Sequence, residues 1–273
     1  MIWAPWFVAG IAQHRHLPRR LKAARISPET FHPCVILPVL NAGSEVESLI
    51  EKLRSELGPA AEIVMVDGGS TTGPPKGASC IIPSKRGRGN QIAAGIAATE
   101  APWILIVHAD SIPRSGWLAN LEKATRIYPD ASLFVFGQRF DRSSPGTLLL
   151  EVLNEMRVVF GSVAFGDQTM VIRRSAINAA GGFPAQPLME DVEASLRLAG
   201  QGRVIYLGKE WTLSARKWGK GFTQRFGLII RLVATYQFAR FKGASHAAAV
   251  SEKMYLEYYP EVPTDRPKLD PRR

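Results

Sequence analysis

Cysteine is scarce in this chain, with Cys34 and Cys80 as its two examples among 273 residues. Two thiols beside separate apolar runs make neither a disulfide scaffold nor a zinc site, so we expect buried free thiols in a reducing compartment. The chain is neither strongly hydrophobic nor strongly polar, and its mean hydropathy is −0.03. That value excludes a disordered chain and a protein with many membrane spans.

Two familiar phosphate-binding loops are also absent. The turn after the first apolar run reads PVLNAGSEV, which lacks the G-x-G-x-x-G pattern, and no G-x-x-x-x-G-K-[ST] loop occurs anywhere. A Rossmann dinucleotide site and a P-loop are therefore poorly supported. Any phosphate that this protein binds must be held by other means.

Negative charge is in deficit, with 24 acidic residues against 34 Lys and Arg and a net charge of +10. This balance favours anionic partners, namely nucleic acid, phosphorylated substrates or an acidic membrane surface. Basic residues cluster at 15–25 and 215–243, while the first twelve residues, MIWAPWFVAGIA, are apolar. That start is too short to span a bilayer. It is either an interfacial segment or the result of a start codon placed too early.

Apolar runs alternate with amphipathic segments in the first half of the chain. We expect strands at 34–40, 62–67, 78–84 and 103–110. Ser44 and Glu47 fit a capping box, which would begin a helix with apolar spacing through Leu57, and a second helix is expected at 89–99. This alternation predicts an α/β fold with a mostly parallel central sheet and helices on both faces.

The second half is less regular. We expect strands at 132–140 and 202–208, helices at 146–160 and 189–200, and a long amphipathic helix near the C-terminus. We divide the chain into an N-terminal extension (1–32), one domain (33–242) with a donor half (33–111) and an acceptor half (112–242), and a C-terminal tail (243–273).

Polar residues collect where the expected parallel strands end, which is where α/β sheets bind ligands. Asp67, followed by two glycines, could accept hydrogen bonds from a base or a ribose, but alone it fits a turn aspartate better. Asp110 could share Mg²⁺ or Mn²⁺ with a diphosphate, and a structural aspartate is equally plausible. His108 fits a buried, hydrogen-bonded histidine better than a ligand.

Two charged clusters stand at expected helix starts. Arg88 belongs to SKRGRGNQ, where guanidinium groups beside a helix N-terminus could bind diphosphate or simply face water. Glu190 and Asp191 begin the helix of PLMEDVEASL. The helix dipole stabilises such anions, so capping explains the pair, and a general base that deprotonates a hydroxyl explains it equally.

Seven segments, in order, resemble the family 2 glycosyltransferases with the GT-A fold. They read VILPVLNAGSEVESLIEKL, EIVMVDGGSTTG, GRGNQIAAGIAA, WILIVHADSIPRSGW, FGDQTMVIRRSAINAAGGFP, PLMEDVEASLRLAGQGRV and SARKW. They cover roughly residues 33–240. The chain is most similar to the bacterial subgroup often labelled arsenosugar-biosynthesis glycosyltransferase-like.

This resemblance implies a role for each matching residue. Asp191 would be the catalytic base of an inverting enzyme, with Glu190 beside it, and Asp110 would be the last acid of a DxD-type metal motif. The implied donor-binding residues are Pro38, Asn41, Asp67, Gly69, Arg88 and Ala109. The implied acceptor and pocket residues are Asp167, Gln168, Arg216 and Trp218.

We therefore expect a metal-assisted transfer of sugar from a UDP- or GDP-sugar to an acceptor hydroxyl, with no nucleic-acid partner. The alternatives are a nucleotidyltransferase-like enzyme and an inactive membrane- or nucleic-acid-binding protein on the same fold. We expect a cytoplasmic location. The stretch 217–243 mixes apolar and basic residues, so its helix either lies on the anionic inner leaflet, with a lipid-linked or amphipathic acceptor, or packs on the sheet.

Overall fold

The computed structural model describes residues 31–165, 167–218 and 221–259. Within them one eight-stranded sheet has the order β3-β2-β1-β4-β7-β6-β8-β5. The parallel pairs are β1–β2, β1–β4, β2–β3 and β6–β8, and the antiparallel pairs are β4–β7, β6–β7 and β5–β8. The expected α/β class with a mixed, mostly parallel sheet is confirmed.

The donor half follows the predicted alternation closely. Its elements are β1 (Cys34–Val39), α2 (Glu45–Leu57), β2 (Ile63–Asp67), β3 (Cys80–Pro83), α3 (Arg88–Ala97) and β4 (Trp103–Ile106). Strands β1, β2 and β4 are almost wholly buried because their continuous apolar runs lie between two helical layers. The apolar stripe of α2, from Val46 to Leu57, is buried as its spacing predicts.

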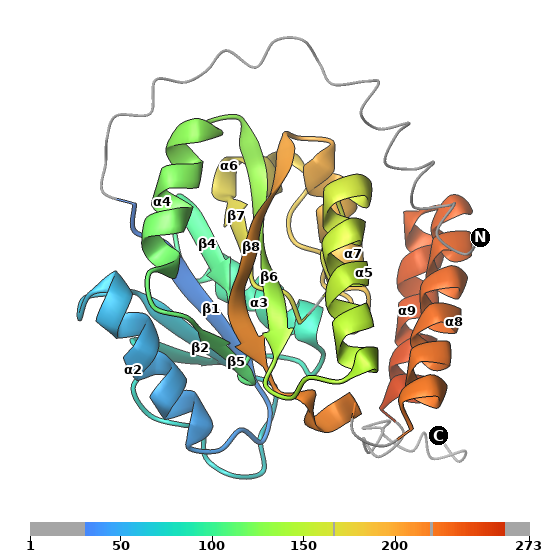
Figure 1. Cartoon of the computed structure of the whole chain (residues 1–273), viewed down its shortest axis with the longest axis horizontal. Helices are drawn as coiled ribbons and strands as arrows, with labels where there is room; N and C mark the ends of the chain where they lie inside the picture. The colour runs from blue at the N-terminus through green and yellow to red at the C-terminus, as the bar shows by residue number, and fades with distance from the viewer. Residues whose placement is uncertain (1–30, 166, 219–220, 260–273) are drawn as a thin grey trace, which may run out of the picture.

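The acceptor half interleaves short and long elements. They are β5 (Ser111–Pro113), α4 (Trp117–Ile127), β6 (Ala131–Phe140), α5 (Pro145–Gly161), β7 (Met170–Arg173), α6 (Arg174–Ala179), α7 (Glu190–Ala199), β8 (Arg203–Leu213), the 3-10 turn η1 (Ala215–Trp218), α8 (Phe222–Phe241) and α9 (Ala244–Tyr258). Strands β6 and β8 run side by side through the middle of the molecule (Figure 1).

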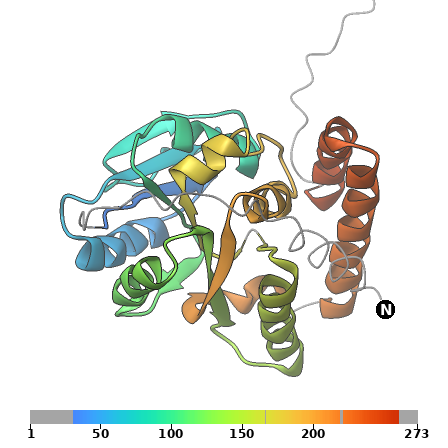
Figure 2. The same cartoon turned by 90° about the horizontal axis from the view of Figure 1, so that it is seen from above.

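Two apolar clusters lie on opposite faces of the sheet. One joins the sheet to α2 and α4, and the other joins it to α3, α6 and α7. Helices α8 and α9 form an antiparallel pair that stands apart from the sheet (Figures 1 and 2). A third cluster ties this pair to α7 through Val192, Leu232 and Tyr236. The long C-terminal helix therefore packs mainly on helices. Its first turns, at Phe222 and Phe226, also pack against a cluster that includes the strand residues Phe140 and Leu213.

Several local expectations are wrong. Cys34 is buried, but Cys80 is exposed because β3 is an edge strand. Ser44 makes no side-chain cap to α2, and the carboxylate of Glu47 instead accepts a hydrogen bond from the backbone N–H of Lys76 at 3.0 Å. Residues 244–258, which we assigned to a tail, form α9. The N-terminal extension through residue 30 and the tail from residue 260 lie outside the described residues.

Candidate active site

The predicted donor residues lie around the carboxyl ends of β1 and β2. The side-chain carbonyl of Asn41 accepts from the backbone N–H of Thr71 at 2.8 Å, and the backbone N–H of Asn41 donates to the Ser70 hydroxyl at 2.8 Å. Ser70 in turn donates from its backbone N–H to the Asp67 carboxylate at 3.1 Å. Ser70 thus links Asn41 to Asp67 and fixes the two loops relative to each other.

Two further donor residues shape this edge without polar side chains. Pro38 is half-buried within β1. Gly69 is exposed and has a φ of 89°, a left-handed conformation that strongly favours glycine. The Gly69 turn therefore keeps a bare backbone open to solvent beside Asp67, as close approach of a ligand requires.

Asp110 lies in the turn between β4 and β5, where Ala109 and Asp110 are both half-buried. His108 is 8% exposed, and its backbone carbonyl accepts a hydrogen bond from Ser111 at 3.0 Å. The described residues contain no group of three or more His, Cys, Asp or Glu able to hold a metal. A single carboxylate fits Mg²⁺ or Mn²⁺ shared with substrate phosphates, but it does not fit an all-protein metal cage.

The acidic pair begins α7 as the sequence predicts, but the structure buries both acids. Glu190 is 0% exposed and Asp191 is 5% exposed. Met189, just before them, has a φ of 59°, which is uncommon outside glycine and marks local strain. On the other side, a Cβ on Gly89 would lie 2.2 Å from the Gln186 carbonyl. Glycine at 89 therefore lets α3 approach the segment that leads into the acidic pair.

Arg88 lies between the two acids. Its guanidinium forms an ion pair with Glu190, and its Nη2 is 3.7 Å from an oxygen of Asp191. Burial disfavours the charged guanidinium, but the neighbouring carboxylates outweigh burial and raise the pKa of Arg88. The structure thus adds a contact that the predicted role in diphosphate binding did not anticipate, because Arg88 contacts the acids of the acceptor half.

Asp191 has the electrostatic character of a general base. Burial raises the pKa of its carboxyl to about 7, with a further increase from the Glu190 charge, while Arg88, the Val192 backbone N–H and Arg157 act in the opposite direction. The Val192 N–H donates to Asp191 at 2.7 Å and orients the carboxylate. A base with a pKa near neutral can accept a proton under physiological conditions and release it afterwards.

Sequence reasoning missed Arg157, a buried cation on α5 behind the site. It donates to the Asn154 side chain at 2.8 Å, the Val163 carbonyl at 3.2 Å and the Gln168 side chain at 2.9 Å. Burial lowers its pKa to about 10. The available signal was Asn154 and Arg157, three residues apart on one face of an otherwise apolar helix.

Asp167 and Gln168 are neighbours in the sequence but differ in burial and in their contacts. Asp167 is half-buried beside the cavity described below and accepts a hydrogen bond from Gln138 at 3.2 Å. Gln168 is 0% exposed, and its side-chain oxygen accepts hydrogen bonds from Arg157 and from the Phe165 backbone. Gln168 therefore supports Arg157 from behind and does not line the cavity.

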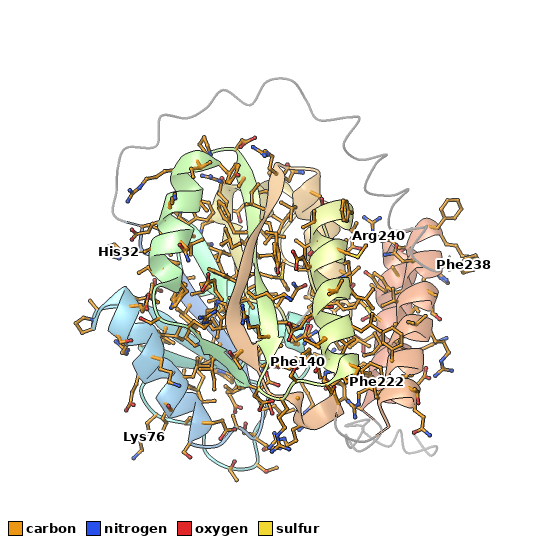
Figure 3. The ribbon with its side chains drawn as sticks, in the orientation of Figure 1. His32, Lys76, Phe140, Phe222, Phe238 and Arg240 are labelled. Atoms are coloured by element: carbon orange, nitrogen blue, oxygen red, sulfur yellow. The ribbon has the colours of Figure 1, made fainter. Side chains whose placement is uncertain are left out.

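A cavity of about 700 Å³ begins at these charged groups and runs between α5 and the α8–α9 pair. Arg88, Asp191, Arg157 and Asp167 contribute charged groups to its wall, and Arg225 and Arg240, from the two ends of α8, line it as well. Most of the remaining lining is apolar, and it includes Leu150, Leu153, Phe226, Ile229, Ile230 and Val233. Figure 3 shows Phe140 and Phe222 near the lower end of α5, and Arg240 near its upper end, facing the space beside α8.

Arg216 and Trp218, both in η1, lie in different surroundings. Trp218 lines the cavity and packs against Phe140 and Phe222, with ring centroids 6.5 and 5.6 Å apart. Arg216 is exposed and contributes to lowering the pKa of Glu45 at the start of α2, after hydrogen bonds to Glu45 and Gly43 backbone groups. Trp218 thus faces the acceptor cavity, whereas Arg216 faces the donor half.

Residues 34–179, just over half of the chain, match the profile described as "Glycosyl transferase family 2". The chain belongs to that family. A search of curated proteins finds no match.

Solved structures with the same fold include three similar enzymes. The mannosyltransferase PcManGT from Pyrobaculum calidifontis, solved with GDP-Man and Mn²⁺, has a TM-score of 0.58 at 17% identity, with 93% of this chain and 79% of that chain covered. TarS 1-349 from S. aureus, solved with UDP-GlcNAc, has a TM-score of 0.54 at 15% identity, covering 84% and 71%. Glucosyl-3-phosphoglycerate synthase from Mycobacterium tuberculosis, solved with Mn²⁺ and UDP, scores 0.50 at 18%, covering 79% and 85%.

Proposed function

We propose that this protein transfers a sugar from a UDP- or GDP-sugar to an acceptor hydroxyl with inversion of the anomeric configuration. One observation carries this proposal: Asp191, a buried carboxylate with a pKa near 7, lines a cavity large enough for an acceptor. Asp191 takes the proton from the acceptor hydroxyl, whose oxygen attacks the anomeric carbon from the face opposite the diphosphate. The bond from that carbon to the diphosphate breaks, and the nucleoside diphosphate leaves.

The donor is held at the carboxyl ends of β1, β2 and β4. Asp67 and the bare backbone at Gly69 accept the nucleoside, and Asn41 fixes the loop beside them. Asp110 is the residue that would hold a divalent cation, and such an ion, when bound, neutralises charge on the departing diphosphate. Arg216, exposed near α2, adds positive charge on the same side of the protein.

Arg88 has a different role in this proposal from the one expected of a donor-loop arginine. Its ion pair with Glu190 and its approach to Asp191 hold the two acids in place while keeping Asp191 partly ionised. Glu190 is therefore a positioning residue rather than a second base. Its other oxygen is buried and makes no hydrogen bond to any described residue.

The acceptor is proposed to be amphipathic or lipid-linked. A cavity whose wall is mostly apolar, with Asp191 among its charged groups, suits a molecule that has a hydroxyl head and an apolar body. The half-buried apolar residues of α8, such as Phe226 and Ile230, line this cavity. The apolar stripe of α8 therefore supports acceptor binding better than the membrane contact expected from its sequence.

A cytoplasmic location with peripheral attachment to the inner leaflet remains our proposal. Among the described helices none is long and apolar enough to cross a membrane. The more specific kinship with the arsenosugar-biosynthesis-like subgroup also stays a proposal, supported by the seven quoted segments.

The pH dependence of transfer tests the assigned base. Below the pKa of Asp191 the carboxyl is protonated and cannot accept a proton, so kcat should fall about tenfold per pH unit on the acid side of neutrality. Single-turnover rates with saturating donor between pH 5 and 8 measure this limb. A flat profile across that range contradicts the role of Asp191.

A thermal-shift screen of sugar nucleotides with and without Mn²⁺ separates the alternatives, because ligands that bind only the folded protein stabilise it. Stabilisation by UDP- or GDP-sugars, followed by their metal-dependent hydrolysis, supports the transferase. Stabilisation by nucleoside triphosphates with release of pyrophosphate would support the nucleotidyltransferase-like alternative. Binding without turnover of any nucleotide would support an inactive binding protein.

A further inference from the structure

Helix α5 carries an apolar outer face that neither the fold nor the proposed chemistry uses. Leu148, Leu149, Val152, Met156 and Val159 are 45–51% exposed. Their spacing of one, three, four and three residues places them on one side of the helix. We call these five residues the α5 face. Between residues 147 and 161, every exposed residue of α5 is apolar.

The charged residues of α5 all point elsewhere. Glu151 pairs with Lys209 of β8 at 3.0 Å, and Glu155 lies close enough to Tyr206 to raise its pKa, after the larger effect of burial. Arg157 is 4% exposed and holds Gln168. The helix therefore has two distinct sides, and the half-buried Glu155 borders the apolar one. A solvent-facing helix in a monomer normally shows the opposite pattern, with charged residues outward.

The α5 face is also continuous with the candidate active site through the helix itself. Leu150, Leu153, Asn154 and Arg157 project from the other side of α5 into the cavity that contains Asp191. One helix thus separates an exposed apolar surface from an apolar-lined cavity. A layer of lipid against the outer side would lie next to the apolar part of the cavity.

We propose that the α5 face docks on the surface of an anionic lipid bilayer, with its five apolar side chains in the boundary between headgroups and acyl chains. An interfacial helix needs a continuous apolar side and nearby cations. Exposed Arg139 and Arg142 lie just before α5. Of the acids in this region, Asp141 accepts a hydrogen bond from the Ala215 backbone at 2.7 Å, and Glu151 pairs with Lys209. The net charge of +10 adds attraction to anionic lipid.

A second copy of the chain fits this surface less well. A two-fold interface pairs the same surface of each subunit, and the α5 face, which is wholly apolar, would offer no acid to Arg139 and Arg142 of the other copy. Two chains of charge +10 also repel each other. Anionic headgroups supply the missing negative charge.

Co-sedimentation with vesicles tests the docking. The full chain is mixed with vesicles of phosphatidylglycerol and phosphatidylcholine, or of phosphatidylcholine alone, at low salt. The variant Leu149→Gln/Val152→Gln/Met156→Gln replaces three half-exposed side chains that do not line the cavity. The matched control is Ile127→Gln, which changes an apolar residue of α4 that is 55% exposed.

The wild type and the control should bind the anionic vesicles, and the triple variant should bind at least about tenfold more weakly. All three should keep the same thermal unfolding midpoint and the same hydrolysis of the sugar-nucleotide donor, so loss of docking is distinguishable from failure of the proposed function. Equal sedimentation of the triple variant and the wild type overturns the proposal, as does absence of wild-type binding. A wild-type dimer that the triple variant converts to a monomer would assign the α5 face to self-association instead.

Discussion

The donor half and the acceptor half prepare their polar groups in opposite ways. Around β1 and β2, Asn41 is exposed and Asp67 is half-buried, and short hydrogen bonds through Ser70 hold them. At the start of α7, Glu190 and Asp191 are buried together with a cation on either side. The donor side is an open edge, whereas the acceptor side is a closed electrostatic cluster.

Under the proposed function, the difference follows from what each substrate brings. A nucleotide-sugar carries its own charges and hydrogen-bonding groups, so a wet edge with a fixed backbone is enough to select it. An acceptor hydroxyl is weakly acidic and must be deprotonated, which requires a carboxylate whose proton affinity has been raised by burial. The protein therefore accepts the energetic cost of burying charge only on the acceptor side.

The largest effect should come from removing the buried base. Asp191→Asn keeps the size of the side chain but cannot accept a proton, so transfer should fall by roughly 10²–10⁴-fold. Donor binding, measured by calorimetry with the nucleotide and Mn²⁺, should be unchanged because the donor edge is separate. Glu190→Gln serves as the control and should reduce transfer less. Normal turnover by the Asp191→Asn variant would contradict the assignment of Asp191 as the base, and with it the contrast drawn between the two halves.

The complementary change acts on the donor edge alone. Asp110→Ala should weaken nucleotide binding in the presence of Mn²⁺ by about 10–100-fold, the typical cost of losing an interaction with a charged group. Binding without metal should be nearly the same in the variant and the wild type. Calorimetric titration of UDP and GDP with and without Mn²⁺ measures both. If Mn²⁺ enhances binding equally in the two proteins, Asp110 does not hold the ion.

A change in the cavity wall should separate acceptor size from donor chemistry. Ile230→Trp adds bulk to the apolar part of the cavity, so kcat/KM for a long-chain acceptor should fall by about tenfold or more. Hydrolysis of the sugar nucleotide by water should stay unchanged, because water needs none of that space. Ile127→Trp, on exposed α4, is the matched control. A similar loss for both substrates would mean that the acceptor does not use the cavity.

The smallest expected effect is on the free energy of unfolding, whose pH dependence reports the cost of burying Asp191. The pKa of Asp191 rises from its ordinary 3.8 to about 7 on folding. The folded state therefore holds more protons than the unfolded state between these values, and the Asp191 contribution to the free energy of unfolding declines as pH rises through this window. Asn at 191 lacks this decline.

The unfolding midpoint of the Asp191→Asn variant, relative to the wild type, should thus increase as the pH is raised from 4 to 8. A change of 1 kcal/mol corresponds to about 2–4 °C for a domain of this size. Scanning calorimetry of both proteins at several pH values measures the difference. A constant difference across this range would show that Asp191 titrates normally.

The same contrast explains what the sequence could predict. The donor half consists of strand–helix units with local signals, so its strands, its helices and the polar ends at Asn41, Asp67 and Asp110 were recognisable. The cluster at α7 joins residues about a hundred positions apart, such as Arg88 and Glu190. No local pattern encodes such a contact, so the ion pair, the burial of both acids and the cavity became visible only in three dimensions.

Some misses have a simpler physical cause. The capping box at Ser44 failed because Glu47 found a competing partner in the Lys76 backbone. Helix α9 was overlooked because its apolar residues contact α7 and α8 rather than the sheet. The predicted roles of the site residues rest on family resemblance and on their placement, and they stay predictions until the variants are measured.

Helix α5 also sets a constraint on how this protein can change in evolution. Each residue turns an α-helix by about 100°, so inserting or deleting a single residue within α5 would rotate everything beyond it by more than a quarter turn. Such an indel would carry Arg157 toward the outer surface and Val159 or its neighbours toward the cavity. Substitutions on either side of α5 should therefore be tolerated far more readily than changes in its length, and related chains should align across this helix without gaps.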